Sequence, residues 1–250
     1  MATAATGSVT RTAPDKRART QRRFEHLFFS GMALLILWVV LYGFRAYFLA
    51  GVFGAHLPSL LVHIHGAAFT LWVLLLVTQT SLVRAGRVDV HRRLGIAGFL
   101  LACVMVVLGI LTPTAALARG VALPGMDPGT FYAVPMLVIL FFGTLIFFAF
   151  RARFQPAAHK RIILIATIAL TSAAFTRWPI AHLNAQVAFL FTYILLACLV
   201  VYDLWSMRRI HPATVWAGAF MVFVDQMSLI VGKTGAWHAF AGWAQRFGHW

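Results

Sequence analysis

Long apolar runs separated by short polar segments dominate this chain of 250 residues. An α-helix rises about 1.5 Å per residue, so roughly 20 apolar residues are needed to cross the ~30 Å hydrocarbon core of a bilayer. Seven segments meet this requirement, approximately 27–50, 57–83, 94–117, 131–150, 161–181, 185–207 and 213–232. The pattern predicts an all-α fold, a polytopic membrane helix bundle of about seven transmembrane helices. The short connections predict that consecutive helices are antiparallel neighbours.

The composition agrees with a bilayer as the solvent of this chain. Hydrophobic residues make up 61% of it and charged residues only 11%, whereas a soluble domain carries about 25% charged residues. A water-soluble fold could not enclose that much apolar surface. The two cysteines, Cys103 and Cys198, both fall inside apolar runs, which predicts small buried side chains rather than a disulfide framework.

Lysine and arginine are distributed unequally between the two sets of connections. With the N-terminus inside, 16 of the 21 basic residues face the cytoplasm and 5 face outward. Such a bias is the positive-inside signal, and it predicts a cytoplasmic N-terminus and an outer C-terminus. It also accounts for the net charge of +15 without a nucleic-acid partner, so the partner expected is the lipid bilayer.

Three regions follow from these patterns. Residues 1–23 are small, polar and basic, which is typical of a disordered cytoplasmic arm beside anionic headgroups. Residues 24–233 form the transmembrane domain. Residues 234–250 place aromatic side chains, among them Trp237 and Phe247, at steps of three and four, which predicts an amphipathic helix in the outer interface.

Histidines recur where helices enter from the cytoplasm. Four lie at or near such helix starts, namely His26, His91, His159 and His211. Cations lie close to three of them, and Arg92, Arg161 and Arg209 are the candidates for contact with an anion. Helix N-termini together with arginine and histidine favour anions, so this layer predicts contact with an anionic phospholipid, a haem propionate or an acidic substrate. Interfacial histidines bonded to loop carbonyls and water are the alternative.

Ionisable residues near the outer face form a second layer. His65, Arg177 and Asp225 are expected at similar depths on three different helices, where a lone carboxyl should be neutral or paired. His65, Trp72 and Gln79 are spaced by seven residues, so they share one face of their helix. We therefore expect an intramembrane polar site at Trp72, Gln79, Arg177 and Asp225, with His65 beside it. A hydrogen-bonded cluster that only fixes helix packing is the alternative.

Several stretches carry a resemblance to a known group of proteins. They are VHIHGAAFTLWVLLLVTQTSLV with VDVHRRLG, AAHKRIILIAT, and VYDLWSMRRIHPATVWAG. Together they resemble an uncharacterised family of bacterial polytopic membrane proteins, which implies a multi-pass protein of the bacterial cytoplasmic (inner) membrane. The pairing of histidine with a cation is distantly similar to cytochrome b561-like haem-b bundles. That resemblance implies haem ligation by histidine, although here the histidines lie at helix ends.

Three functions remain open from the sequence. The first is a membrane redox or electron-transfer protein holding haem b or a metal through His65, His91, His159 and His211, since histidine is a good iron ligand. The second is a proton-coupled or anion transporter, or a sensor, that uses an intramembrane His/Asp site. The third is a membrane enzyme acting on a phospholipid. No nucleotide, hydrolase or metalloprotease motif is present, so the sequence assigns neither catalytic residues nor a metal-ligand set.

Overall fold

The computed structural model describes residues 16–52, 59–180 and 184–249, and these residues form helices and connections without strands. The helices are α1 Lys16–Gly43, α2 Arg45–Val52, α3 Leu60–Arg84, α4 Val88–Ala118, α5 Pro128–Arg151, α6 Pro156–Leu170, α7 Ser172–Phe175, α8 Ala185–Met207, α9 Pro212–Val231 and α10 Gly235–Gln245. Seven stretches within them are long and apolar enough to cross a membrane. The all-α, seven-helix prediction is confirmed, and the chain is a multi-pass integral membrane protein.

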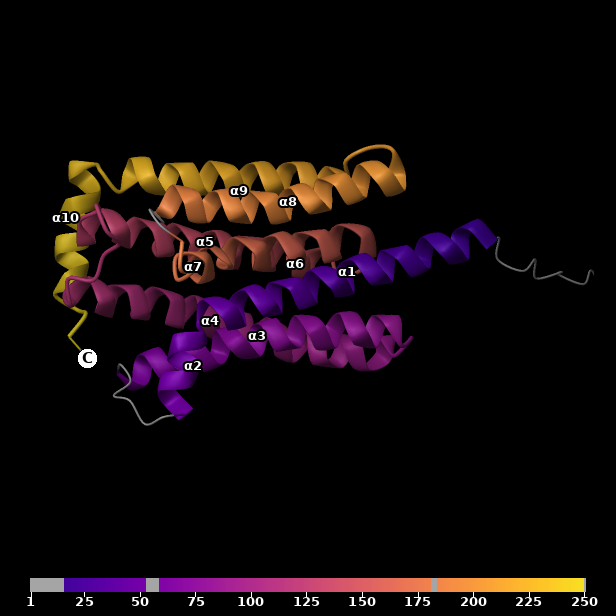
Figure 1. Cartoon of the computed structure of the whole chain (residues 1–250), viewed down its shortest axis with the longest axis horizontal. Coiled ribbons are helices and arrows are strands. Elements are labelled where there is room, and N and C mark those ends of the chain that lie inside the picture. Colours follow the sequence, from indigo (N-terminus) through magenta and orange to yellow (C-terminus); the bar gives the residue numbers. More distant parts are fainter. Residues whose placement is uncertain (1–15, 53–58, 181–183, 250) are drawn as a thin grey trace, which may run out of the picture.

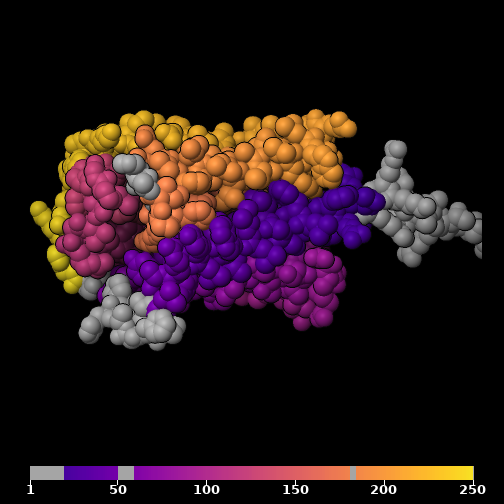
Figure 2. All heavy atoms as spheres, in the orientation of Figure 1, coloured from indigo at the N-terminus to yellow at the C-terminus, as the bar shows by residue number. Residues whose placement is uncertain are grey.

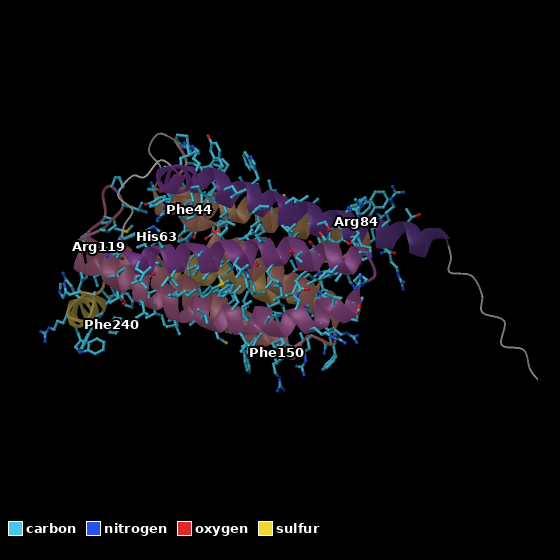
Figure 3. The ribbon with its side chains drawn as sticks, turned by 90° about the horizontal axis from the view of Figure 1, so that it is seen from below. Phe44, His63, Arg84, Arg119, Phe150 and Phe240 are labelled. Atoms are coloured by element: carbon cyan, nitrogen blue, oxygen red, sulfur yellow. The ribbon has the colours of Figure 1, made fainter. Side chains whose placement is uncertain are left out.

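The long helices lie side by side in an elongated bundle (Figure 1). We call the end at which α1, α4, α6 and α9 begin the basic end, because Arg84, Arg92, Arg153 and Arg209 lie there. Arg84 lies toward this end, whereas His63, Arg119 and Phe240 lie toward the other (Figure 3). The sequence predicts that the basic end faces the cytoplasm, and that orientation stays a prediction.

α5 and α6 form the centre of the bundle. In their most apolar stretches, 56% of the residues of α5 and 67% of those of Pro156–Phe175, which comprises α6 and α7, are buried, against 22% for α3. α4 and α9 pack on α5, and α8 and α9 pack on α6. Phe142, Leu145 and Ile165 are completely enclosed there. The less buried helices present their apolar side chains outward, as helices that face lipid do.

α1 crosses one face of the bundle obliquely. Its indigo surface runs between the orange surface of α8 and the magenta surface of α3 and α4 (Figure 2). Near the basic end Phe28 stacks on Tyr202 of α8, with ring centroids 4.1 Å apart. Farther along, α1 packs on α3 and then on α7. This helix therefore ties the two sides of the bundle together.

Several helices begin earlier than the hydrophobic pattern predicts. α4 begins at Val88 instead of residue 94, and α6 begins at Pro156 instead of residue 161. α1 begins at Lys16, so residues 16–23 of the predicted arm are helical, while residues 1–15 lie outside the described part. An apolar run marks only the part of a helix that lies in the hydrocarbon core, whereas the helix itself can continue into the headgroup layer. As a result, His91 and His159 are the fourth residues of their helices, within the first turn.

α10 lies across the end of the bundle opposite the basic end (Figure 1). Its first turn is capped by Thr234, whose hydroxyl accepts a hydrogen bond from the Trp237 amide. The Trp237 indole donates to the Gly129 carbonyl at 2.9 Å and so fixes α10 to the start of α5. Phe240, Trp243 and Phe247 stay exposed on the other face of the segment. Residues 235–245 of the predicted segment are therefore helical, with one face on the bundle and the other exposed, and the position of this helix in the outer interface stays a prediction.

Candidate functional site

A cavity of about 510 Å³ opens at the basic end between α1, α3, α4, α5 and α6. Its wall is mostly apolar and includes Phe29, Ser30, Trp72, Gln79, His91, Gly95, Phe99, Phe150 and His159. Pockets that hold cofactors or drug-sized ligands have roughly 300–1,000 Å³ and an apolar lining with a few polar groups. This cavity has both properties, and it brings together residues that the sequence placed in two separate layers.

His159 reaches the cavity from the first turn of α6. Its Nδ1 atom lies 2.8 Å from the Ala149 carbonyl oxygen at the end of α5. A carbonyl can only accept, so Nδ1 carries the proton and donates it. The neutral ring then has its lone pair on Nε2. A histidine held by an Nδ1–H bond to a backbone carbonyl is the arrangement that orients histidine ligands in metal sites.

His91 enters the same cavity from the first turn of α4. Its ring is half-buried, Nδ1 is enclosed, and the Gln79 backbone carbonyl lies beside the ring. A ligand in the cavity would therefore approach Nε2, as it would on His159. The Oε1 atom of Gln79 and the Oγ atom of Ser30 are also enclosed and unpartnered on this wall. Buried polar atoms normally have partners, so these two oxygen atoms on the cavity wall favour a bound group that supplies them.

The two histidines lie at matched depth. Each is the fourth residue of its helix, about 4.5 Å along the axis from the first residue. α4 and α6 both run from the basic end, and α5 lies between them and packs on both. His91 and His159 therefore flank the cavity at one level, from two different helices.

Cations surround the mouth of the cavity. Arg92 and Arg153 are exposed on its rim. Lys160 forms an ion pair with Glu25 and lies 4.7 Å from the centre of the Phe29 ring. The site is thus apolar at its wall and positively charged at its mouth, which suits a flat or elongated apolar molecule with an anionic end.

Trp72 closes the inner end of the cavity. Its indole Nε1 donates to the Thr167 hydroxyl of α6 at 3.2 Å, and Thr167 in turn donates to the Ile163 carbonyl. The ring of Phe142 packs edge-on against Trp72, with centroids 5.3 Å apart. These contacts join α3, α5 and α6 at one point, so the wall of the cavity is fixed on rigid helices.

A second polar group at the basic end joins α6, α8 and α9. The Arg161 guanidinium donates through Nε and Nη2 to one oxygen of Asp203, at 3.0 and 2.6 Å. The other oxygen accepts from the Thr214 hydroxyl at 2.6 Å and from the His211 amide at 3.1 Å. Arg161 and Asp203 are 2% and 0% exposed. The Arg161 guanidinium is therefore paired with Asp203 inside the bundle. This pairing differs from the contact with a lipid headgroup that the sequence analysis expected.

His211 has a structural task in this group. Its ring Nδ1 accepts a hydrogen bond from the Ala213 amide at 3.0 Å and so caps α9. Burial, together with the nearby Arg161 guanidinium, lowers the pKa of His211, which keeps the ring neutral. An accepting Nδ1 places the proton on Nε2, the reverse of His159. His211 therefore does not share the donor geometry of the cavity histidines, and Arg209 beside it is exposed at the same end.

The predicted outer layer does not come together as one cluster. The His65 ring stacks on Phe69 and donates to the Leu108 carbonyl at 3.4 Å. It lies 14 residues before Gln79 on α3, about 21 Å from it along the axis. Arg177 donates to the Ala173 carbonyl and covers the Phe44 ring, 4.6 Å from its centre. Asp225 lies beside Tyr193 of α8 instead of beside either predicted partner.

Asp203 is a buried charged side chain at the basic end that the sequence analysis left out of its candidate site residues. The signal was a single carboxylate within an apolar run, four residues before the end of α8 and therefore near the depth of Arg161. Within the described parts of the chain, no three His, Cys, Asp or Glu side chains come together as a metal site. Comparisons with protein-family models, curated proteins and solved structures find no match for this chain.

Proposed function

We propose that this protein binds haem b in the cavity at the basic end and works as a membrane electron-transfer protein. The observation that carries the proposal is the pair His91 and His159. Both lie at one depth on the cavity wall, each with Nδ1 turned into the protein and Nε2 available. Two histidines are sufficient to hold haem iron, so the lack of a three-residue metal site among the described residues does not bear on it.

The remaining residues fit the other parts of such a cofactor. Phe29, Trp72, Phe99 and Phe150 would pack against the macrocycle and exclude water from it. Arg92 and Arg153 on the rim would bind the two propionates. When bound, the group supplies one-electron chemistry. The chain contributes the ligand nitrogens, the apolar surroundings and the positive charge.

The proposal places the protein in the bacterial inner membrane with the cavity near the cytoplasmic side, as the positive-inside bias predicts. A shallow hollow of about 400 Å³ lies beside the cavity and shares His26 with it. It is lined by Arg22, Arg23 and Arg84 besides Leu27. Three guanidinium groups in one hollow at the membrane surface suit the phosphate of an anionic phospholipid.

The absorbance spectrum tests this function. The protein is purified in detergent from cells supplied with a haem precursor, and its spectrum is recorded oxidised and then reduced with dithionite. We expect a Soret band and sharpened α and β bands on reduction. His91→Ala and His159→Ala should each abolish or shift the reduced spectrum, because each removes one ligand.

His63→Ala is the matched control, since His63 is an exposed histidine of α3 that donates to the Ser59 carbonyl far from the cavity. It should leave the spectrum unchanged. A colourless protein from haem-supplied cells contradicts the proposal, and so does a haem spectrum that neither cavity variant alters.

A further inference from the structure

Asp225 is a buried carboxyl group, and none of the described residues places a cation beside it. It is 2% exposed and lies in α9, about 20 Å from the first residue of that helix and about 9 Å from the last. Its Oδ2 atom is enclosed and accepts no hydrogen bond. No salt bridge reaches it from the part of the chain that the structure describes.

The surroundings of Asp225 supply one polar neighbour. α9 packs against α5, α6 and α8. From these helices, and within the described residues, Tyr193 of α8 is the only titratable group that lies against Asp225. The Gln226 amide donates to the Tyr193 hydroxyl at 3.0 Å. The tyrosine oxygen is therefore an acceptor from Gln226, and its own O–H remains available to Asp225.

An ionised carboxylate in this position would be strongly unfavourable. Burial of an unpaired charge is far more costly than burial of the neutral acid, so such a group becomes neutral instead. For Asp225 the neutral form requires a bound proton. The acid then has one O–H to donate, which the apolar surroundings tolerate far better than a negative charge.

We propose that Asp225 is a proton-binding site of the membrane domain, filled at neutral pH and in exchange with water along Tyr193 and Gln226. In the filled state one carboxylate oxygen forms an O–H bond with a proton from water, and the side-chain charge changes from −1 to zero. Tyr193 keeps its own proton. Gln226 is exposed on the bundle surface about 7.5 Å from the last residue of α9, where a long polar side chain can reach the aqueous boundary, and Tyr193 is half-buried beside it, so these side chains connect Asp225 with that end of the bundle.

This inference is independent of haem binding, because it uses neither the cavity nor its histidines. It also differs from the relay expected from the sequence, which joined Asp225 to His65 and Arg177. The two predicted partners lie elsewhere, with contacts of their own.

Infrared spectroscopy of the purified full-length protein tests the proposal. At neutral pH we expect the C=O stretching band of a protonated carboxylic acid. The band should be absent in Asp225→Asn and present in Asp89→Asn, a control that removes an exposed carboxylate. Transfer to ²H₂O should shift the band, because the acid proton exchanges. Tyr193→Phe should slow that shift, since it removes the hydroxyl between Gln226 and Asp225.

Three results would overturn the proposal. Asp225→Asn could remove a carboxylate band instead of an acid band, which would show that the group is ionised. The acid band could resist ²H₂O, which would show a sealed acid without exchange. Addition of Na⁺ at constant pH could abolish the acid band, which would show a site for a metal cation.

Discussion

Asp203 and Asp225 are both enclosed carboxyl groups, 0% and 2% exposed, on the neighbouring helices α8 and α9. Asp203 accepts four hydrogen bonds, two of them from the Arg161 guanidinium. Asp225 lies beside a single tyrosine, and one of its oxygens has no partner. The same residue type at the same degree of burial therefore has opposite surroundings. Burial alone does not decide whether a membrane carboxyl is charged, whereas its donors do.

The largest effect is expected from Asp203→Asn. The change leaves the Arg161 guanidinium enclosed without its counter-charge, and removal of one partner of a buried ion pair costs about 3–5 kcal/mol. The measurement is the free energy of unfolding in mixed micelles titrated with SDS. Arg161→Met combined with Asp203→Leu should restore much of the loss, because no unpaired charge remains. Equal losses in the single and double variants would show that the pair does not act as a pair.

Asp127 is an exposed aspartate, and its replacement should change the free energy of unfolding less than replacement of the buried Asp203. Its Oδ1 atom accepts from the Thr130 amide at 2.9 Å and caps α5. Asp127→Ala should cost about 1 kcal/mol in unfolding free energy, the usual contribution of an N-cap. Asp127→Asn keeps an acceptor at the cap without the charge and is the matched control.

The cap also predicts a dependence on pH. Hydrogen bonds from Thr130 hold the pKa of Asp127 below its ordinary value of 3.8. A carboxyl whose pKa is lowered by folding stabilises the protein above the ordinary pKa, and this stabilisation is lost as the pH falls through the folded pKa. The difference between the parent protein and Asp127→Asn should therefore shrink in acid. A difference that does not change with pH would mean that the charge has no part in the cap.

The smallest effect is expected from Asp225→Asn. If Asp225 is a neutral acid, asparagine replaces it with a neutral group of the same shape, and the unfolding free energy should change by less than about 1 kcal/mol. The same measurement applied to both aspartates thus separates them. A loss at Asp225 as large as that at Asp203 would remove the distinction between the two sites.

The sequence predicted the elements of this fold much better than it predicted their neighbours. Apolar length depends on the chain alone, so the seven spans were predicted correctly in number and type. The depth of Asp225 along its helix was also within reach. Its partner was not, because depth does not specify which side of a helix faces which neighbour. Tyr193, within an apolar run of α8, gave no signal that distinguished it from other tyrosines.

For the cavity, too, the sequence identified residues without predicting which of them lie together. His91, His159, Trp72 and Gln79 were all singled out, but they were divided between a cytoplasmic layer and an intramembrane line. The structure places all four in the lining of one cavity, because α4 and α6 begin before the hydrophobic runs do. Hydrophobicity alone could not supply that extra helical turn.

The Arg161–Asp203 pair also has a consequence for the biogenesis of the protein. The two residues are 42 positions apart, so a ribosome delivers α6 to the membrane well before it has made this part of α8. Arg161 is only about 7.5 Å from the first residue of α6, within reach of the aqueous boundary for a long side chain. We expect α6 to lie closer to the aqueous boundary at the basic end until α8 is inserted and Asp203 neutralises the charge of Arg161. The central helix of the bundle would then reach its final depth only after a later one has been inserted.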